Sequence, residues 1–236
     1  MTTTYIITGS QSKIGLQIIN DLLKKGSKVF AIDLKLDRTQ NGMKGDICDP
    51  DFVSDIFSTI LKHTSEIRLI NLAGITLPES GVYSIESWKK TIEINAYGTF
   101  LLLREFHLRL VNSQILSGSI VTVSSAVSNK SLRDNPAYPA SKLAVEALTR
   151  HYANKLAQYN VSVNCISPGY IESGMAESSY NVIELREKRS NLSYLKRWGK
   201  VEEVSELALF LLDKHSTFVT GAVYPIDGGW SSNSDL

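Results

Sequence analysis

The chain has 236 residues, which is enough for one domain of ordinary size and short for two. It carries 25 Lys and Arg against 24 Asp and Glu, a net charge of +1, so it offers no general electrostatic surface for nucleic acid or an anionic membrane. Its two cysteines, Cys48 and Cys165, cannot make a disulfide framework and lack metal-ligand spacing. No apolar run approaches the ~20 residues of a membrane span, and no leader peptide is visible, so we expect a cytoplasmic protein.

Short apolar runs alternate with longer amphipathic stretches. In chain order we predict a strand at 5–8, a helix at 14–25, a strand at 29–32, a third strand ending near 45–47, a helix over 52–60, a strand at 69–72, a long helix from about 85 to 110, a strand at 120–123, a helix at 140–158, a strand at 161–166, a helix at 201–212 and a strand at 223–226. Buried strands between amphipathic helices indicate a parallel sheet covered on both faces. We therefore predict one doubly wound, Rossmann-like α/β domain over residues 1–236, with an irregular segment at about 172–198.

The first predicted strand ends in a glycine-containing turn, Thr8-Gly9-Ser10-Gln11-Ser12-Lys13-Ile14-Gly15, and a helix follows. Small residues at such a turn let backbone N–H groups approach a pyrophosphate at the positive end of the helix. An ordinary tight turn has the same pattern. Asp33 closes the second strand, where a carboxylate accepts hydrogen bonds from an adenosine ribose and repels a 2′-phosphate. This favours NAD, although Lys35 and Arg38 lie nearby and a solvated loop residue remains the alternative.

Tyr138 and Lys142 are spaced i and i+4, so both side chains share one helix face. Asn135 and Pro136 are typical of an N-cap and a first helical residue, which places Tyr138 in the first turn. A nearby ammonium lowers the pKa of a tyrosine from about 10 and fits it for proton transfer. An exposed pair on a helix is the alternative.

Ser125 and Asn95 extend this pair. Ser125 follows a predicted strand and precedes Tyr138 by 13 residues, so its hydroxyl can hold a substrate oxygen. Asn95 lies on an otherwise largely apolar helix face, and a buried asparagine must be hydrogen-bonded. It is either a structural residue or a relay of protons or water to Lys142.

With these residues placed, the chain resembles the short-chain dehydrogenase/reductase family in its shorter, single-domain form. The resemblance extends from Thr8 to Gly229 and rests on motifs in the family's order and spacing: Thr8-Gly9…Gly15, Asp33, Asp46-Ile47, Asn71-Leu72-Ala73-Gly74, Asn95, Ser125, Tyr138-x-x-x-Lys142, Ser167-Pro168-Gly169 and Thr220-Gly221…Asp227-Gly228-Gly229.

The resemblance implies a role for each residue in an NAD(P)-dependent oxidoreductase that transfers a hydride between the cofactor and a secondary alcohol or ketone. Tyr138 would be the general acid/base, Ser125 would bind the reacting oxygen, Lys142 would lower the tyrosine pKa and bind the nicotinamide ribose, and Asn95 would hold a water of the proton path. The implied cofactor contacts are Gly9, Ser12, Lys13, Ile14, Gly15, Asp33, Asp46, Ile47, Leu72, Ala73, Gly74, Tyr138, Lys142, Ile171 and Ser173. No metal is implied.

Two positions depart from the family. Lys13 stands where the family usually has the middle glycine, and it would crowd the pyrophosphate, place a positive charge beside it, or reach a 2′-phosphate, so NADP stays open beside NAD. Leu72 stands where the family usually has a second asparagine, a mild change if backbone makes the contact.

The substrate is the least defined part. The residues expected to surround it are Ile75–Glu79, Lys130, Arg133, Asp134, Met175, Tyr180, Arg186 and Arg189, and in the family the segment at about 172–198 forms a lid. We expect a polar substrate, such as a sugar derivative or an acyl carrier-linked ketone; Lys130 and Arg133 either bind an anionic group of this substrate or are solvated surface charges. Family members are commonly homotetramers, and apolar residues on the two long helices (Tyr97, Leu101, Leu108, Leu148, Tyr152, Leu156) are consistent with a tetramer or dimer. The alternatives are a catalytically silent dinucleotide-binding sensor or scaffold and an isomerase or dehydratase of sugar nucleotides.

Overall fold

The structure, a computed structural model, describes residues 3–36, 41–112, 114–130, 132 and 134–233. Seven parallel strands form one sheet in the order β3-β2-β1-β4-β5-β6-β7. Their bounds are Thr3–Thr8 (β1), Lys28–Asp33 (β2), Gly42–Lys44 (β3), Glu66–Asn71 (β4), Ser117–Val123 (β5), Val161–Pro168 (β6) and Val223–Ile226 (β7). The predicted doubly wound α/β fold is confirmed.

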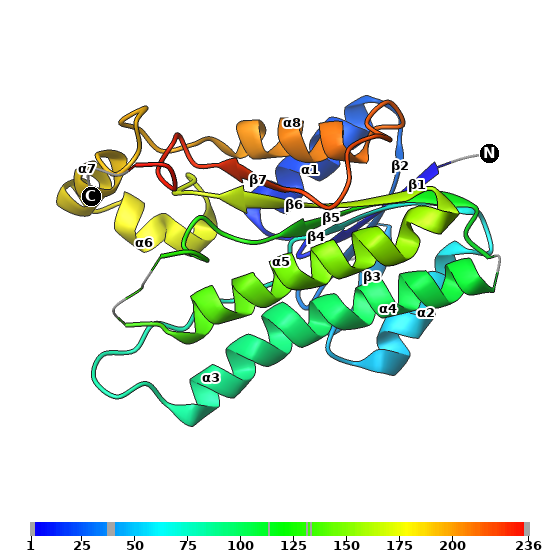
Figure 1. Ribbon diagram of the computed structural model, residues 1–236, viewed down its shortest axis with the longest axis horizontal. Coiled ribbons are helices and arrows are strands. Elements are labelled where there is room, and N and C mark those ends of the chain that lie inside the picture. The colour runs from blue at the N-terminus through cyan, green and yellow to red at the C-terminus, as the bar shows by residue number, and fades with distance from the viewer. Residues whose placement is uncertain (1–2, 37–40, 113, 131, 133, 234–236) are drawn as a thin grey trace.

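Helices cover both faces of the sheet (Figure 1). Helices α1 (Lys13–Lys24) and α8 (Val201–Leu212) lie on one face, and α2 (Pro50–Ile60), α4 (Gly98–Val111) and α5 (Ala137–Leu156) lie on the other. Helix α3 (Ile85–Ile92) leads into α4, and the short α6 (Glu177–Tyr180) and α7 (Ile183–Ser190) lie at one end of the sheet. Among the described residues, none of these helices combines the length and apolarity that crossing a membrane requires.

Local sequence explains where several helices begin. Ser12 precedes α1 and accepts a hydrogen bond from the Gly15 N–H at 3.0 Å. Asp49 precedes α2 in the same way and is followed by Pro50, whose fixed φ suits the first helical position. These caps satisfy backbone N–H groups that have no partner inside the helix.

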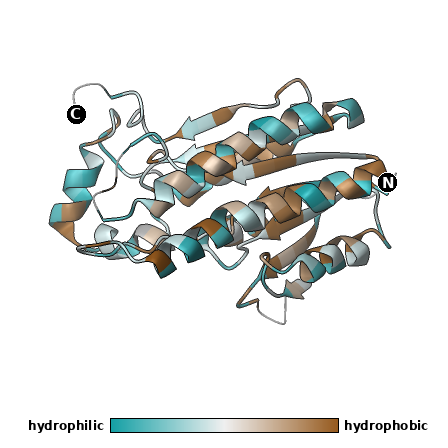
Figure 2. Ribbon diagram, turned by 60° about the horizontal axis from the view of Figure 1, so that its bottom comes forward, coloured by the Kyte–Doolittle hydropathy of each residue, from teal (hydrophilic) through white to brown (hydrophobic). Residues whose placement is uncertain are grey.

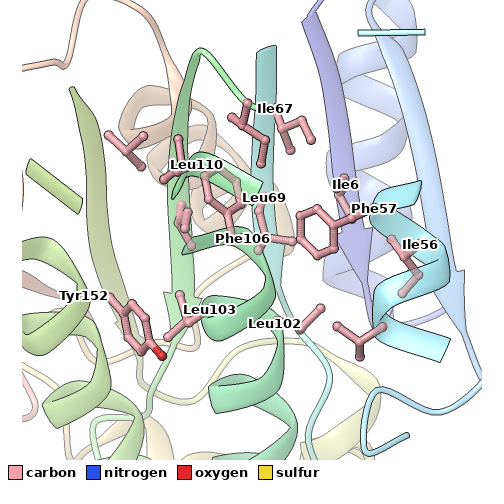
Figure 3. Close-up of a cluster of buried hydrophobic side chains, with 14 of the residues drawn as sticks. Ile6, Ile56, Phe57, Ile67, Leu69, Leu102, Leu103, Phe106, Leu110 and Tyr152 are labelled. Carbon is pink, nitrogen blue, oxygen red and sulfur yellow. The ribbon is translucent and has the colours of Figure 1, made fainter. Parts of the chain in front are cut away.

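Each face of the sheet buries a separate apolar core. Between the sheet and α2, α4 and α5, Phe57 and Phe106 meet edge to face with ring centroids 6.0 Å apart (Figure 3). Ile18 of α1 and Leu211 of α8 belong to the core of the opposite face, and both are fully buried. Coloured by hydropathy, the strands are largely brown, because a parallel sheet is covered on both sides (Figure 2).

The structure shifts some predicted bounds. The third strand ends at Lys44, just before the expected 45–47, and α5 begins at Ala137, earlier than the expected 140. The predicted long helix from about 85 to 110 is confirmed as the continuous helical stretch of α3 and α4, but it contains a π-helical turn at Glu93–Tyr97 that the periodicity did not predict. Arg38 and Arg133, named among the charged candidates, lie outside the described residues.

Candidate active site

A cavity of about 900 Å³ opens where the carboxyl ends of β1, β4, β5 and β6 meet α6. The chain leaves the sheet centre in opposite directions from β1 and β4, and such a switch point is where open α/β sheets bind their ligands. The predicted residues that line the cavity are Ser12, Lys13, Ile14, Leu72, Gly74, Ser125, Tyr138, Lys142, Ile171 and Ser173. The remaining predicted residues, Gly9, Gly15, Asp33, Asp46, Ile47, Ala73 and Asn95, lie outside this lining.

The turn after β1 has room only for glycine at two positions. Gly9 has φ +62°, and a Cβ there would lie 2.7 Å from the Ala73 nitrogen. A Cβ at Gly15 would lie 2.7 Å from the Gly9 carbonyl oxygen. The turn therefore packs closely against the segment after β4 and leaves the first N–H groups of α1 beside the cavity. This is the backbone cradle that a pyrophosphate requires.

Lys13, the departure from the family pattern, does not fill this cradle. Its Nζ lies 2.9 Å from the Glu177 Oε1 at the start of α6, and both side chains are half exposed. The ion pair joins the glycine turn to the segment expected to form the lid. In water an exposed pair of this kind contributes little stability, typically below ~1 kcal/mol.

Asp33 ends β2 with its carboxylate close to the glycine turn. Its Oδ2 accepts a hydrogen bond from the Gln11 N–H, and its Oδ1 accepts one from the Lys35 N–H, both at 3.0 Å. The carboxylate is therefore held in a fixed orientation at the position where a ribose is expected.

Asp46 and Ile47 are placed differently from each other. The Ile47 side chain is buried in the core, where a Cβ at Gly98 would lie 2.7 Å from its Cδ1. Asp46 caps the Cys48 N–H at 2.9 Å and lines a second cavity of about 650 Å³ beside α3. Only the backbone of Ile47 is thus available to an adenine.

The segment after β4 is fixed by Asn71. Its side chain accepts hydrogen bonds from the Thr8 hydroxyl and from the Ala73 N–H at 3.2 Å, and donates to the Thr99 hydroxyl at 2.8 Å. This network ties β1, β4 and α4 together, and it places Leu72 and Gly74 along the cavity wall.

Tyr138 and Lys142 project from the first turns of α5 into the cavity. The Lys142 Nζ lies 5.6 Å from the centroid of the Tyr138 ring and donates to the Val123 carbonyl at 2.9 Å. The Asn135 side chain accepts from the Tyr138 N–H at 3.1 Å, so it caps the helix as expected. The Tyr138 hydroxyl also lies 3.7 Å from the Met175 sulfur.

The protonation of this pair differs from the expectation. Burial raises the pKa of Tyr138 to about 12, and a hydrogen bond with Ser125 acts in the opposite direction. Burial also lowers the pKa of Lys142 to about 8. The expected lowering of the tyrosine pKa is therefore absent in the protein alone, because desolvation disfavours the phenolate and the ammonium alike.

Asn95 occupies the π-helical turn and is buried. Its Oδ1 accepts from the Ile75 N–H at 2.8 Å, and its Nδ2 donates to the Ile75 carbonyl and to the Ser141 hydroxyl, each at 2.9 Å. Ser141 in turn donates to the Tyr138 carbonyl at 2.8 Å. A Cβ at Gly74 would lie 3.1 Å from the Asn95 Oδ1 and 3.3 Å from the Lys142 Nζ, so Asn95 and Lys142 approach each other there.

Sequence reasoning missed the group that holds the Ser125 segment. The buried Glu146 carboxylate accepts hydrogen bonds from the Ser124 and Ser128 hydroxyls, both at 2.7 Å, on either side of Ser125. Glu146 lies four residues after Lys142, so it shares the helix face of the reacting pair. The spacing of four residues between Lys142 and Glu146 could have identified Glu146 from the sequence.

The substrate end of the cavity is lined only partly as expected. Ile75–Pro78, Asp134, Met175 and Arg189 line it, whereas Glu79, Lys130, Tyr180 and Arg186 do not. Lys130 lies outside this lining, so the cavity gives no support to a contact between Lys130 and an anionic group of the substrate. Within the described residues, no group of three or more His, Cys, Asp and Glu side chains could hold a metal ion.

Known proteins resemble this chain in sequence over nearly its whole length. The sequence profile of a family described as enoyl-(acyl carrier protein) reductase matches residues 10–231. An L-xylulose reductase from Caenorhabditis elegans is 30% identical over 97% of this chain and 95% of its own, and a 3-oxoacyl-[acyl-carrier-protein] reductase from Thermotoga maritima is 32% identical over 95% and 96%.

Solved structures are similar over the whole chain as well. A short-chain type dehydrogenase/reductase from Mycobacterium ulcerans has a TM-score of 0.89 and 26% identity, covering 98% of this chain and 90% of its own. A 4-hydroxyisoleucine dehydrogenase complexed with NADH has a TM-score of 0.89 and 29% identity, covering 99% and 100%.

Proposed function

The chain belongs to the short-chain dehydrogenase/reductase family and is an NAD(P)-dependent oxidoreductase, and from this premise we propose how its residues share the work. Tyr138 is the general acid/base for the substrate oxygen, and Ser125 donates a hydrogen bond to that oxygen. The observation that carries the proposal is the convergence of Ser125, Tyr138 and Lys142 on one cavity beside the glycine turn.

The residues present fit a dinucleotide. Gly9 and Gly15 allow the turn to pack closely against neighbouring backbone, and the start of α1 offers N–H groups to a pyrophosphate. Asp33 would accept hydrogen bonds from the adenosine ribose, and Lys142 would bind the nicotinamide ribose. Leu72, Ala73, Gly74, Ile171 and Ser173 would complete the contacts. When bound, the nicotinamide supplies or accepts the hydride.

We assign NAD as the cofactor because two backbone N–H groups hold the Asp33 carboxylate in place, and a carboxylate at this position repels a 2′-phosphate. Lys13 is the residue that opposes this assignment, and its ion pair with Glu177 directs its charge toward α6. Titration with NADH and NADPH, followed by nicotinamide fluorescence, decides between the two.

The protonation state favours carbonyl reduction at neutral pH. A pKa of about 12 keeps the proton on the Tyr138 Oη, from which it can pass to a developing alkoxide. Hydrogen bonds link Asn95 to Ser141 and Ser141 to the Tyr138 carbonyl in the first turn of α5. Asn95 would hold the water that returns a proton to the Tyr138 hydroxyl. The substrate is a polar ketone or secondary alcohol, either a sugar derivative or an acyl-linked ketone, as the relatives' names support.

The segment at about 172–198 acts as a lid, because Ser173, Met175 and Arg189 from it line the cavity. The cysteines are free, which supports a cytoplasmic location. A homo-oligomer, as a tetramer or dimer, would use exposed Tyr97 and Leu108. The other four residues considered for this contact, Leu101, Leu148, Tyr152 and Leu156, pack in or against the core of the protomer.

The test is Tyr138→Phe, which removes the hydroxyl and keeps the ring. We expect carbonyl reduction to fall by at least about 100-fold while NADH affinity stays within twofold. Exposed Tyr194→Phe, outside the cavity lining, is the matched control. Full activity of Tyr138→Phe would reject the assignment of Tyr138 as the general acid/base.

A further inference from the structure

The side of the cavity formed by the lid segment carries an arginine on an aromatic wall. The Tyr170 ring stacks on Trp230 with centroids 4.8 Å apart, and both line the cavity. The Arg189 guanidinium lies 4.7 Å from the centroid of the Tyr170 ring and lines the cavity too. A guanidinium on an aromatic face keeps its N–H groups free to bind at its edge.

Arg189 differs from the other cations that line the cavity. Lys13 is paired with Glu177, and Lys142 donates to the Val123 carbonyl. Among the described residues, no carboxylate lies within ion-pair distance of Arg189. Its charge therefore faces the cavity without a protein anion to neutralise it.

The arginine and the reacting centre share one apolar cluster. Val127 and Trp230 belong to a small buried core, and Tyr138 and Tyr170 both pack against it. A substrate carbon chain lying on this cluster would have its reacting oxygen at Tyr138 and its other end toward Tyr170 and Arg189. A short linear molecule matches this arrangement. One polar end would meet the Tyr138 hydroxyl, its carbon chain would lie on the apolar cluster, and its other polar end would meet the Arg189 guanidinium.

Resting on the proposed function, we propose that Arg189 binds a carboxylate or phosphate at the far end of the substrate, which makes the substrate a short anionic hydroxy or keto compound. An arginine forms two parallel hydrogen bonds with either group. The carboxylate of Asp134 also lines the cavity and repels an anion.

The test compares sorbitol, which is neutral, with sorbitol 6-phosphate and gluconate in oxidation by NAD. We expect at least about tenfold higher kcat/KM for an anionic member. Arg189→Met should lower that value about 10- to 100-fold, mainly through KM, and leave sorbitol within twofold. Arg189→Lys should restore part of the loss. Arg186→Met is the matched control, because Arg186 lies on the same helix over Tyr180 and does not line the cavity.

Binding provides the second readout. Sorbitol 6-phosphate and gluconate are titrated into NADH-saturated protein by calorimetry, with sorbitol as reference. This measures the affinity of each compound whether or not the enzyme turns it over. Tighter binding of an anion in the wild type, lost in Arg189→Met, supports the inference, and preference for phosphate or carboxylate tells the two groups apart. Equal binding of all three compounds, or equal loss for sorbitol and the anions in Arg189→Met, overturns it. Failure of the proposed function would instead appear as full activity of Tyr138→Phe.

Discussion

Lys142→Met should make the cofactor-free protein more stable at neutral pH while it removes activity. Lys142 is 5% exposed, and burial lowers its pKa from 10.5 to about 8, so the folded protein holds its ammonium unfavourably. At about 1.4 kcal/mol per pH unit, this difference costs roughly 3 kcal/mol below pH 8. Methionine keeps most of the side-chain volume and carries no charge.

Part of this gain is offset. The Val123 carbonyl loses the hydrogen bond from Nζ, which costs about 1–2 kcal/mol when the group is left unpaired. The net gain is about 1–2 kcal/mol at pH 7, or roughly 2–8 °C in Tm for a chain of this size.

The sign of the pH dependence follows from the lowered pKa. Between pH 8 and 10.5 the unfolded chain binds the Lys142 proton and the folded chain does not, so the wild type gains stability as pH rises through this window. The variant lacks this gain. Its advantage should be full below pH 8 and be lost near pH 9 to 9.5, because the wild type gains about 1.4 kcal/mol per pH unit there, and the wild type should be the more stable protein at pH 10.

The assay is urea unfolding of the cofactor-free wild type and Lys142→Met at pH 7, 8, 9 and 10, with exposed Lys62→Met as the control. The difference between two proteins at each pH cancels the titration of all other groups. A variant that is less stable at pH 7, or a difference that does not change with pH, would refute the reasoning.

Three further predictions follow from the site. Gly9→Ala forces a Cβ to 2.7 Å from the Ala73 nitrogen at φ +62°, so we expect NADH affinity to fall more than about tenfold and stability to fall by ~1–3 kcal/mol, measured by fluorescence titration and urea unfolding. Glu146→Ala frees the segment around Ser125, so kcat should fall about tenfold with NADH affinity unchanged; an equal fall in both would mean general unfolding. Because burial raises the pKa of Tyr138 and keeps its proton in place at neutral pH, alcohol oxidation should rise as the pH is raised from 7 to 8, and a flat steady-state profile would contradict this.

Local patterns in the sequence were enough to predict the fold class and to nominate most residues of the candidate site. Alternating buried strands and amphipathic helices specify a parallel doubly wound sheet whatever the details of packing. The i, i+4 spacing of Tyr138 and Lys142 brings them together on any helix, and the Gly9 turn follows a strand directly.

Features that depend on contacts between distant segments could not be predicted from local patterns and are visible only in the folded chain. The long helix from α3 to α4 contains a π turn at Asn95 that its apolar periodicity does not predict, and the Asn95 side chain there bonds to Ile75 across the fold. The Lys13 charge is directed to Glu177, 164 residues later, and away from the glycine cradle. The raised pKa of Tyr138 follows from burial in the assembled cavity, a property that no spacing along the chain encodes.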